Sequence, residues 1–164
     1  MKTLCLLRHA KAGWNSGILS DFDRPLDDSG KAEAPIMARR LRDQSFAPEL
    51  IVTSPAKRAR STAKIFAHIL EYPADRIIHR QEIYDQALDG LLAIIQALDD
   101  HWSRAMLVGH NPYLSHLAEW LSGEKIGNVP PCGLAAFTFP VDSWQEIRCA
   151  GGRLLFYEHP GTQK

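Results

Sequence analysis

Short apolar runs alternate along this chain with longer segments of helical period, and this alternation constrains the fold more than any other feature. The apolar runs predict strands at residues 3–8, 49–54, 75–79 and 104–109. The segments that follow them predict helices at residues 29–44, 55–70, 88–98 and 112–121, although Pro35 weakens the start of the first helix. Further strands joined by turns are predicted at residues 134–139, 144–148 and 153–158. This order predicts an α/β three-layer sandwich, with a mostly parallel central sheet, helices on both faces and an antiparallel edge.

The length and the charge balance restrict the classes of protein to consider. The 164 residues contain no repeat and no linker-like stretch, so we expect one domain over residues 1–164. Lys plus Arg and Asp plus Glu both number 19, and this balance argues against nucleic acid or an anionic membrane as a partner. No apolar segment reaches the ~20 residues that span a bilayer, and the first apolar run is too short for a signal peptide. Three cysteines without CxxC spacing fit reduced thiols, so we expect a cytoplasmic protein.

Cationic residues and histidines follow three of the predicted strands directly. Arg8 and His9 come at the end of the first strand, Arg58 lies shortly after the second, and His110 follows the fourth. The carboxyl ends of parallel strands meet at one edge of a sheet, and ligands of such sheets bind there. We therefore expect two arginines and two histidines to converge at this edge.

Two of the predicted helices begin at the same edge. Ser54 and Asn111 each precede a proline, which is typical of a helix cap followed by the first helical residue. Helix N-termini offer free N–H groups, and guanidinium groups bind phosphate oxygens through paired hydrogen bonds. Neighbouring positive charge disfavours protonation of a histidine, which leaves a neutral imidazole that can act as a nucleophile. These strand ends therefore predict a site for phosphoryl transfer.

Three motifs, in this order, resemble those of the histidine phosphatase superfamily, whose fold is shared with the cofactor-dependent phosphoglycerate mutases. They are LLRHAKAGWN at residues 6–15, SPAKRARSTA at residues 54–63 and VGHNP at residues 108–112. The resemblance extends from residue 3 to about residue 139. The small size, the segment DRPLDDSG at residues 23–30 and the segment IYD at residues 83–85 are similar to the SixA-type phosphohistidine phosphatases.

The resemblance implies a role for each matching residue. His9 is expected to be the nucleophile that forms a phosphohistidine intermediate, and Arg8 and Arg58 are expected to bind the phosphoryl oxygens. His110 is expected to hydrogen-bond the transferred group, and Asn111 is counted with the phosphate-binding residues. Catalysis of this kind relies on positioning and electrostatics, so neither a metal nor a cofactor is expected.

The chain departs from the family pattern at two points. Ala10 follows the Arg-His pair where many members have glycine, although the residue remains small. Larger members have a glutamate that acts as acid and base, and its best-placed counterpart here is Asp85, with Glu82 second and Asp89 third. The alternative for Asp85 is a solvated loop acid or a helix cap. A missing acid suits a phosphoramidate substrate, because a serine or sugar alkoxide has a far greater need of a proton as it leaves.

These observations predict a phosphatase that works through phospho-His9 on a phosphohistidine carried by another protein. The short segments between the motifs leave little material for a lid, which suits a substrate on a protein surface. Trp14 is a candidate for lining the mouth of the site, and Lys11 and Lys57 are candidates for adding positive potential. Two alternatives stay open: a phosphatase of small-molecule phosphomonoesters, favoured by a working Asp85, and a phosphate-binding module without turnover. The other histidines show no metal-ligand spacing, so no metal site is expected.

Overall fold

A six-stranded sheet with the strand order β3-β2-β4-β1-β5-β6 forms the centre of the protein. The computed structural model describes residues 1–14 and 20–162, so Asn15 at the end of the first motif lies outside the described residues. The strands are β1 (Lys2–Arg8), β2 (Leu50–Thr53), β3 (Ile78–His79), β4 (Arg104–Gly109), β5 (Leu134–Phe139) and β6 (Arg153–Glu158). Strands β1 to β4 pair in parallel, whereas β5 is antiparallel to both β1 and β6. The predicted fold class is confirmed.

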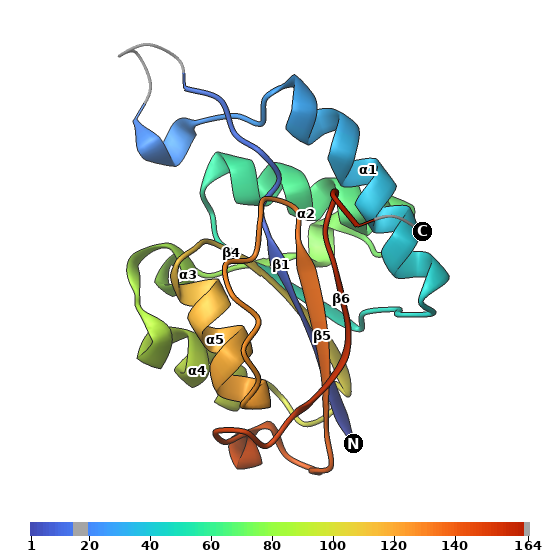
Figure 1. Cartoon of the computed structure of the whole chain (residues 1–164), viewed down its shortest axis with the longest axis vertical. Helices are drawn as coiled ribbons and strands as arrows, with labels where there is room; N and C mark the ends of the chain where they lie inside the picture. The colour runs from blue at the N-terminus through green and yellow to red at the C-terminus, as the bar shows by residue number, and fades with distance from the viewer. Residues whose placement is uncertain (15–19, 163–164) are drawn as a thin grey trace.

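Helices cover both faces of this sheet, as Figure 1 shows. One face carries α1 (Asp28–Asp43) and α2 (Lys57–Ile69), and the other carries α3 (Gln81–Asp85), α4 (Leu88–Gln96) and α5 (Tyr113–Ser122). The side chains of β1 divide between the two faces because successive side chains of a strand point to opposite sides. Cys5 and Leu7 belong to the core under α1 and α2, whereas Leu4 and Leu6 belong to the core under α4 and α5. The molecule is therefore a three-layer sandwich.

Several predicted boundaries need correction. Residues 144–148 do not form a strand, because Trp144–Glu146 form the short 3-10 helix η3. The side chains of Ser143 and Glu146 cap it in a capping box, which is a helix-start signal, and the Trp144 side chain is fully buried. The strand predicted at residues 75–79 is reduced to β3, because the 3-10 helix η2 (Ala74–Arg76) takes the place of its first half.

The helices also differ from their predicted bounds. Helix α1 begins at Asp28, with the Asp27 side chain accepting the N–H of Gly30 at 2.8 Å, and it continues through Pro35. The two helices expected to start at proline begin later, at Lys57 and Tyr113. Helix α3 was not predicted, since its five residues are too few to show a helical period. No helix within the described ranges is both long and apolar enough to cross a membrane.

The register of the parallel strands places their carboxyl ends level with one another. Arg8 in β1 is the partner of Gly109 in β4, and Val108 in β4 is the partner of Thr53 in β2. The next residue along each chain segment is then His9, His110 or Ser54. This level edge is where the predicted site lies.

Candidate active site

His9 is held firmly at the end of β1. Its main-chain N–H donates to the Gly109 carbonyl at 3.1 Å, and its carbonyl accepts the N–H of Cys132 at 3.0 Å. Its ring Nδ1 lies 2.7 Å from the Ala10 carbonyl oxygen. A carbonyl oxygen can only accept a hydrogen bond, so Nδ1 carries the proton and Nε2 keeps a free lone pair.

The surroundings of His9 keep its ring neutral. The residue is only 8% exposed. Burial lowers the pKa of His9 to about 3; the hydrogen bond to Ala10 opposes this shift, whereas the positive charges of His110, Arg58 and Arg8 add to it. At neutral pH the imidazole is therefore unprotonated on Nε2, as a nucleophile requires.

Arg8 and Arg58 bring two guanidinium groups to the same place. Nη1 of Arg8 donates to the Val129 carbonyl at 2.9 Å, and Nη1 of Arg58 donates to the Asp21 carbonyl at 2.7 Å. The Nε atoms of both arginines are buried without a hydrogen-bond partner among the described residues. Burial and the charge of Arg58 lower the pKa of Arg8. An anion bound here would accept hydrogen bonds from the free N–H groups and offset the repulsion between the two guanidinium groups.

His110 lies directly beside His9, with the two ring centroids 5.1 Å apart. Its Nε2 is 2.7 Å from Oγ of Ser54, and its Nδ1 is buried without a partner in the described part of the chain. Burial lowers the pKa of His110 to about 4; the charges of Arg58 and Arg8 act in the same direction, and Asp21 opposes them. Ser54 was predicted to be the N-cap of a helix, but the N-cap of α2 is Ala56, and the Ser54 hydroxyl is instead the hydrogen-bond partner of the second histidine.

These groups surround a cavity of about 270 Å³. Its lining includes the cationic residues Arg8, Lys11, Arg24 and Arg58 together with both histidines. A second cavity of about 420 Å³ shares Arg58, His110 and Asn111 with the first. The structure therefore brings together the four residues that the sequence pointed to, at a cationic cavity that opens toward a second one.

Asn111 lines both cavities, but its side chain is already engaged. Its Nδ2 donates both hydrogens, to the Asn128 side chain at 2.8 Å and to the Val129 carbonyl at 2.7 Å, and its Oδ1 accepts the N–H of Ser115 at 3.1 Å. In this arrangement the amide has no donor left for a phosphate oxygen. The side chain instead holds the 128–129 segment, whose Val129 carbonyl also fixes Arg8.

The candidate acids lie in different surroundings. Asp85 is exposed at the end of α3 and lines the second cavity together with His110. Glu82 forms an ion pair with Arg80 at 2.8 Å, and Asp89 lies exposed in the first turn of α4. Of the three, Asp85 is the one that shares a cavity with His110.

The remaining predicted residues lie around the mouth. Trp14 is exposed and stacks on Arg24, with the guanidinium carbon 3.8 Å from the ring centroid. Lys11 lines the first cavity, whereas Lys57 is exposed in the first turn of α2. Trp14 therefore packs on a cation that itself lines the site.

Sequence reasoning missed Asp21 and Tyr84, which contact the catalytic cluster. The Asp21 carboxylate lies 3.1 Å from Nη2 of Arg58 and accepts the Tyr84 hydroxyl at 2.7 Å. The rule that a buried arginine has an acidic partner could have prompted a search for such an acid. The sequence could not indicate which acid this is, because Asp21 and Arg58 are 37 positions apart.

Known proteins are similar to this chain in family profile, in structure and in sequence. The profile of the histidine phosphatase superfamily (branch 1) matches residues 4–107. A protein assigned as the phosphohistidine phosphatase SixA of Agrobacterium tumefaciens has a similar structure, with a TM-score of 0.83, 31% identity, and coverage of 97% of this chain and 98% of that one. The corresponding SixA protein of Nakamurella superposes with a TM-score of 0.80 at 24% identity over 98% and 97% of the two chains, a likeness of fold. An uncharacterised chloroplastic protein of Arabidopsis thaliana is 31% identical over 92% of this chain and 72% of its own length.

Proposed function

The chain belongs to the histidine phosphatase superfamily and is a phosphatase, and on this premise we propose that it removes phosphoryl groups from phosphohistidine on another protein, through His9. One observation carries the proposal. A buried, neutral His9 lines the same cavity as Arg8, Arg58 and His110, each of which has a buried nitrogen atom without a partner among the described residues. This is the arrangement that a phosphoryl group needs: a nucleophile on one side and donors for its oxygens around it.

The reaction has two steps. In the first, Nε2 of His9 attacks phosphorus and forms a P–N bond, while the bond from phosphorus to the substrate nitrogen breaks. The leaving imidazole takes the bonding electron pair and a proton from solvent. In the second, water attacks the phosphorus of phospho-His9, the P–N bond breaks, and inorganic phosphate leaves. Throughout, Nδ1–H of His9 remains bonded to the Ala10 carbonyl, which fixes the ring.

Ser54 sets the role of His110 in this proposal. Oγ of Ser54 accepts the N–H of Ala56 at 3.2 Å and lies 2.7 Å from Nε2 of His110, and we assign the hydroxyl hydrogen to this second contact. An acceptor at Nε2 places the imidazole proton on Nδ1. Nδ1–H is then a neutral donor for a phosphoryl oxygen, and its hydrogen bond strengthens as negative charge develops there.

The second cavity is the place that we assign to the leaving group. Its lining includes Arg58 and His110 together with Tyr84 and Tyr113. A planar imidazole can pack against such aromatic rings. The assignment of the 31% identical Agrobacterium protein to phosphohistidine phosphatases supports the same substrate class here.

One observation favours a second candidate function, the hydrolysis of small-molecule phosphomonoesters. Asp85 lines the leaving-group cavity beside His110, where a carboxylic acid could protonate a leaving alkoxide. A phosphoramidate would need this proton less, so the two functions differ in their dependence on Asp85.

The test is phosphate release by the metal-free protein from a phosphohistidine peptide, a phosphoserine peptide and a small phosphomonoester. The proposal predicts fast release from phosphohistidine alone, loss of activity in His9→Ala, and little change in Asp85→Asn. His68→Ala, which removes an exposed histidine from α2, is the matched control and should keep full activity.

Two other outcomes would replace the proposal. Preference for the phosphomonoester, with a large loss in Asp85→Asn, would make the protein a phosphatase of small molecules. Phosphate binding without release from any substrate, retained in His9→Ala, would identify a binding module.

A further inference from the structure

Asp21 lies outside the motifs of the chain but at the centre of a hydrogen-bond network. It begins the 3-10 helix η1 (Asp21–Asp23), which lies between the first motif and α1. Its carbonyl accepts Nη1–H of Arg58 at 2.7 Å, and its Oδ2 accepts Nη2–H of the same arginine at 3.1 Å. Its carboxylate also accepts the Tyr84 hydroxyl at 2.7 Å and Nη1–H of Arg24 at 3.1 Å. One residue therefore contacts three side chains, which come from the C-cap of η1, from α2 and from α3.

The network determines how Arg58 meets the cavity. Asp21 accepts one hydrogen bond from each terminal nitrogen of the guanidinium: its main-chain carbonyl accepts from Nη1 and its carboxylate accepts from Nη2. Nε–H and the second hydrogen of each terminal nitrogen stay available, and Nε is buried without a partner in the described residues. Hydrogen bonds at both terminal nitrogens hold the planar guanidinium against rotation about the Cδ–Nε bond, so its remaining N–H groups keep one direction.

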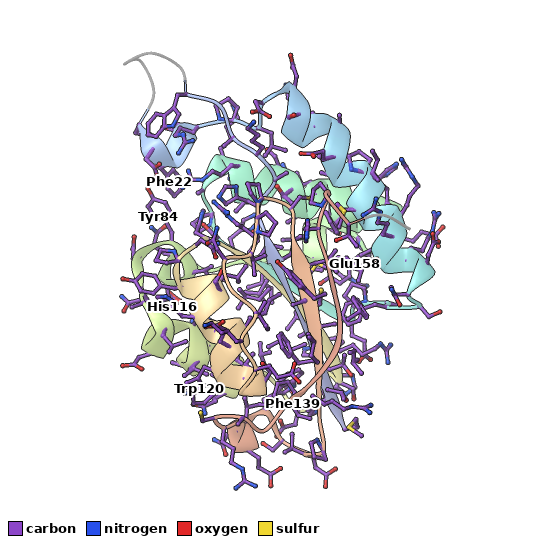
Figure 2. All side chains as sticks on the ribbon, in the orientation of Figure 1. Phe22, Tyr84, His116, Trp120, Phe139 and Glu158 are labelled. Carbon is purple, nitrogen blue, oxygen red and sulfur yellow. The ribbon has the colours of Figure 1, made fainter. Side chains whose placement is uncertain are left out.

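The network also reaches His110. The Tyr84 ring packs edge-on against the His110 ring, with centroids 5.6 Å apart, and against Phe22 of η1 at 5.1 Å. Figure 2 shows Phe22 and Tyr84 next to each other where η1 approaches α3. The hydroxyl bond to Asp21 fixes the tyrosine from the opposite end of its ring. Asp21 thus holds the second arginine of the site directly and reaches the second histidine through Tyr84.

Chemistry argues against a proton-donating role for Asp21. Burial alone would raise its pKa, but the hydrogen bonds from Tyr84, Arg24 and Arg58 outweigh this and lower the pKa of Asp21 to about 2. The same hydrogen bond raises the pKa of Tyr84, so its hydroxyl keeps its proton. Neither group is a suitable general acid near neutral pH.

We propose that Asp21 is a positioning residue, which holds the Arg58 guanidinium and the Tyr84 ring in the orientation that phosphoryl binding requires. This inference rests on the proposed function, because it assumes that Arg58 and His110 contact the phosphoryl group. The role includes the Tyr84 hydroxyl, which connects Asp21 to the ring that packs against His110.

The experiment compares Asp21→Ala and Asp21→Asn with Asp23→Asn. Asp23 lies in the same 3-10 helix, is exposed, and accepts a hydrogen bond from Ser20 at 2.9 Å. For each variant we would measure kcat and KM with the best substrate, and the Kd of inorganic phosphate by calorimetry. Loss of a fixed binding geometry costs on the order of 10- to 100-fold in kcat/KM. We expect a loss in this range for Asp21→Ala, with a parallel rise in the Kd of phosphate, partial rescue in Asp21→Asn, and wild-type values for Asp23→Asn.

A second arm tests the connection through Tyr84. Tyr84→Phe removes the hydroxyl and keeps the ring. If the tyrosine acts through Asp21, the double variant Asp21→Ala/Tyr84→Phe should have the same kcat/KM and phosphate Kd as Asp21→Ala alone. In Asp21→Ala the Tyr84 hydroxyl has already lost its hydrogen-bond partner, so removing it changes nothing further.

Three outcomes would overturn the inference. An unchanged Kd for phosphate with a lower kcat on the phosphoserine peptide only would make Asp21 a general acid. A loss of thermal stability with wild-type kinetics and phosphate binding would make its role structural. Wild-type behaviour in every measurement would leave it without a role. The phosphate Kd keeps this test separate from the proposed function, because it can be measured even if phosphohistidine proves not to be the substrate.

Discussion

Acidification should destabilise this protein mainly through His9 and His110, the two buried histidines of the candidate active site. The pKa of His9 is lowered to about 3 and that of His110 to about 4, against an ordinary value of 6.5 for a histidine in the unfolded chain. Below pH 6.5 the unfolded chain therefore takes up two protons that the folded protein does not. The stability is fully present above pH 6.5 and is lost as the pH falls toward the folded-state pKa values.

The size of the effect follows from these values. Each histidine contributes a slope that approaches ~1.4 kcal/mol per pH unit once the unfolded chain is protonated. Integrated for both groups, the loss in the free energy of unfolding between pH 6.5 and pH 5 is about 3 kcal/mol. This is a large part of the ~5–15 kcal/mol that stabilises a typical domain.

Urea unfolding in phosphate-free buffer between pH 7.5 and pH 5 measures this loss. Because one of two titrating groups is removed, His110→Gln should lose only about half as much stability as the wild type over the same range. His68→Gln, at an exposed position, should follow the wild type. A wild-type loss below ~1 kcal/mol, or equal slopes for wild type and His110→Gln, would refute the view that the two rings are buried in the neutral form.

Two further substitutions test the supports of the site. Ser54→Ala removes the hydrogen-bond partner of His110. Since such a bond contributes ~1–2 kcal/mol, kcat should fall about tenfold. The control Ser122→Ala, which removes a hydroxyl bonded only within its own segment of the described chain, should leave kcat unchanged. Gly30→Ala places a Cβ against the Lys11 carbonyl, so the loop after β1 must move. We expect a loss of ~1–3 kcal/mol in the free energy of unfolding and a higher Kd for phosphate. An unchanged Kd would contradict this reasoning.

The sequence indicated the central part of the site because each piece of it is local. An apolar run followed by Arg8 and His9 identifies a strand and its end, and the same holds for Gly109 and His110. Parallel pairing then aligns the strand ends without any further information. The convergence of the four residues could therefore be predicted from their places at or shortly after the predicted strand ends, once the strands are taken as parallel.

The parts that could not be predicted depend on long-range contacts or on weak local signals. Asp21 reaches Arg58 across 37 positions and Tyr84 across 63, and nothing near it in the sequence indicates either partner. The segment that begins at Trp144 has the apolar composition of a strand, but the capping box formed with Ser143 fixes it as a short helix. Asn111 was placed correctly beside the site, yet its amide donors are used by a loop 17 and 18 positions away.

The most direct test of the mechanism is to trap its intermediate. The protein would be mixed with a phosphohistidine peptide, quenched in alkali within milliseconds, digested and analysed by mass spectrometry, since phosphohistidine survives alkali. We predict one phosphoryl group on His9, formed before inorganic phosphate appears and absent in His9→Ala. Phosphate release without any phosphorylated histidine, or continued turnover by His9→Ala, would contradict the account.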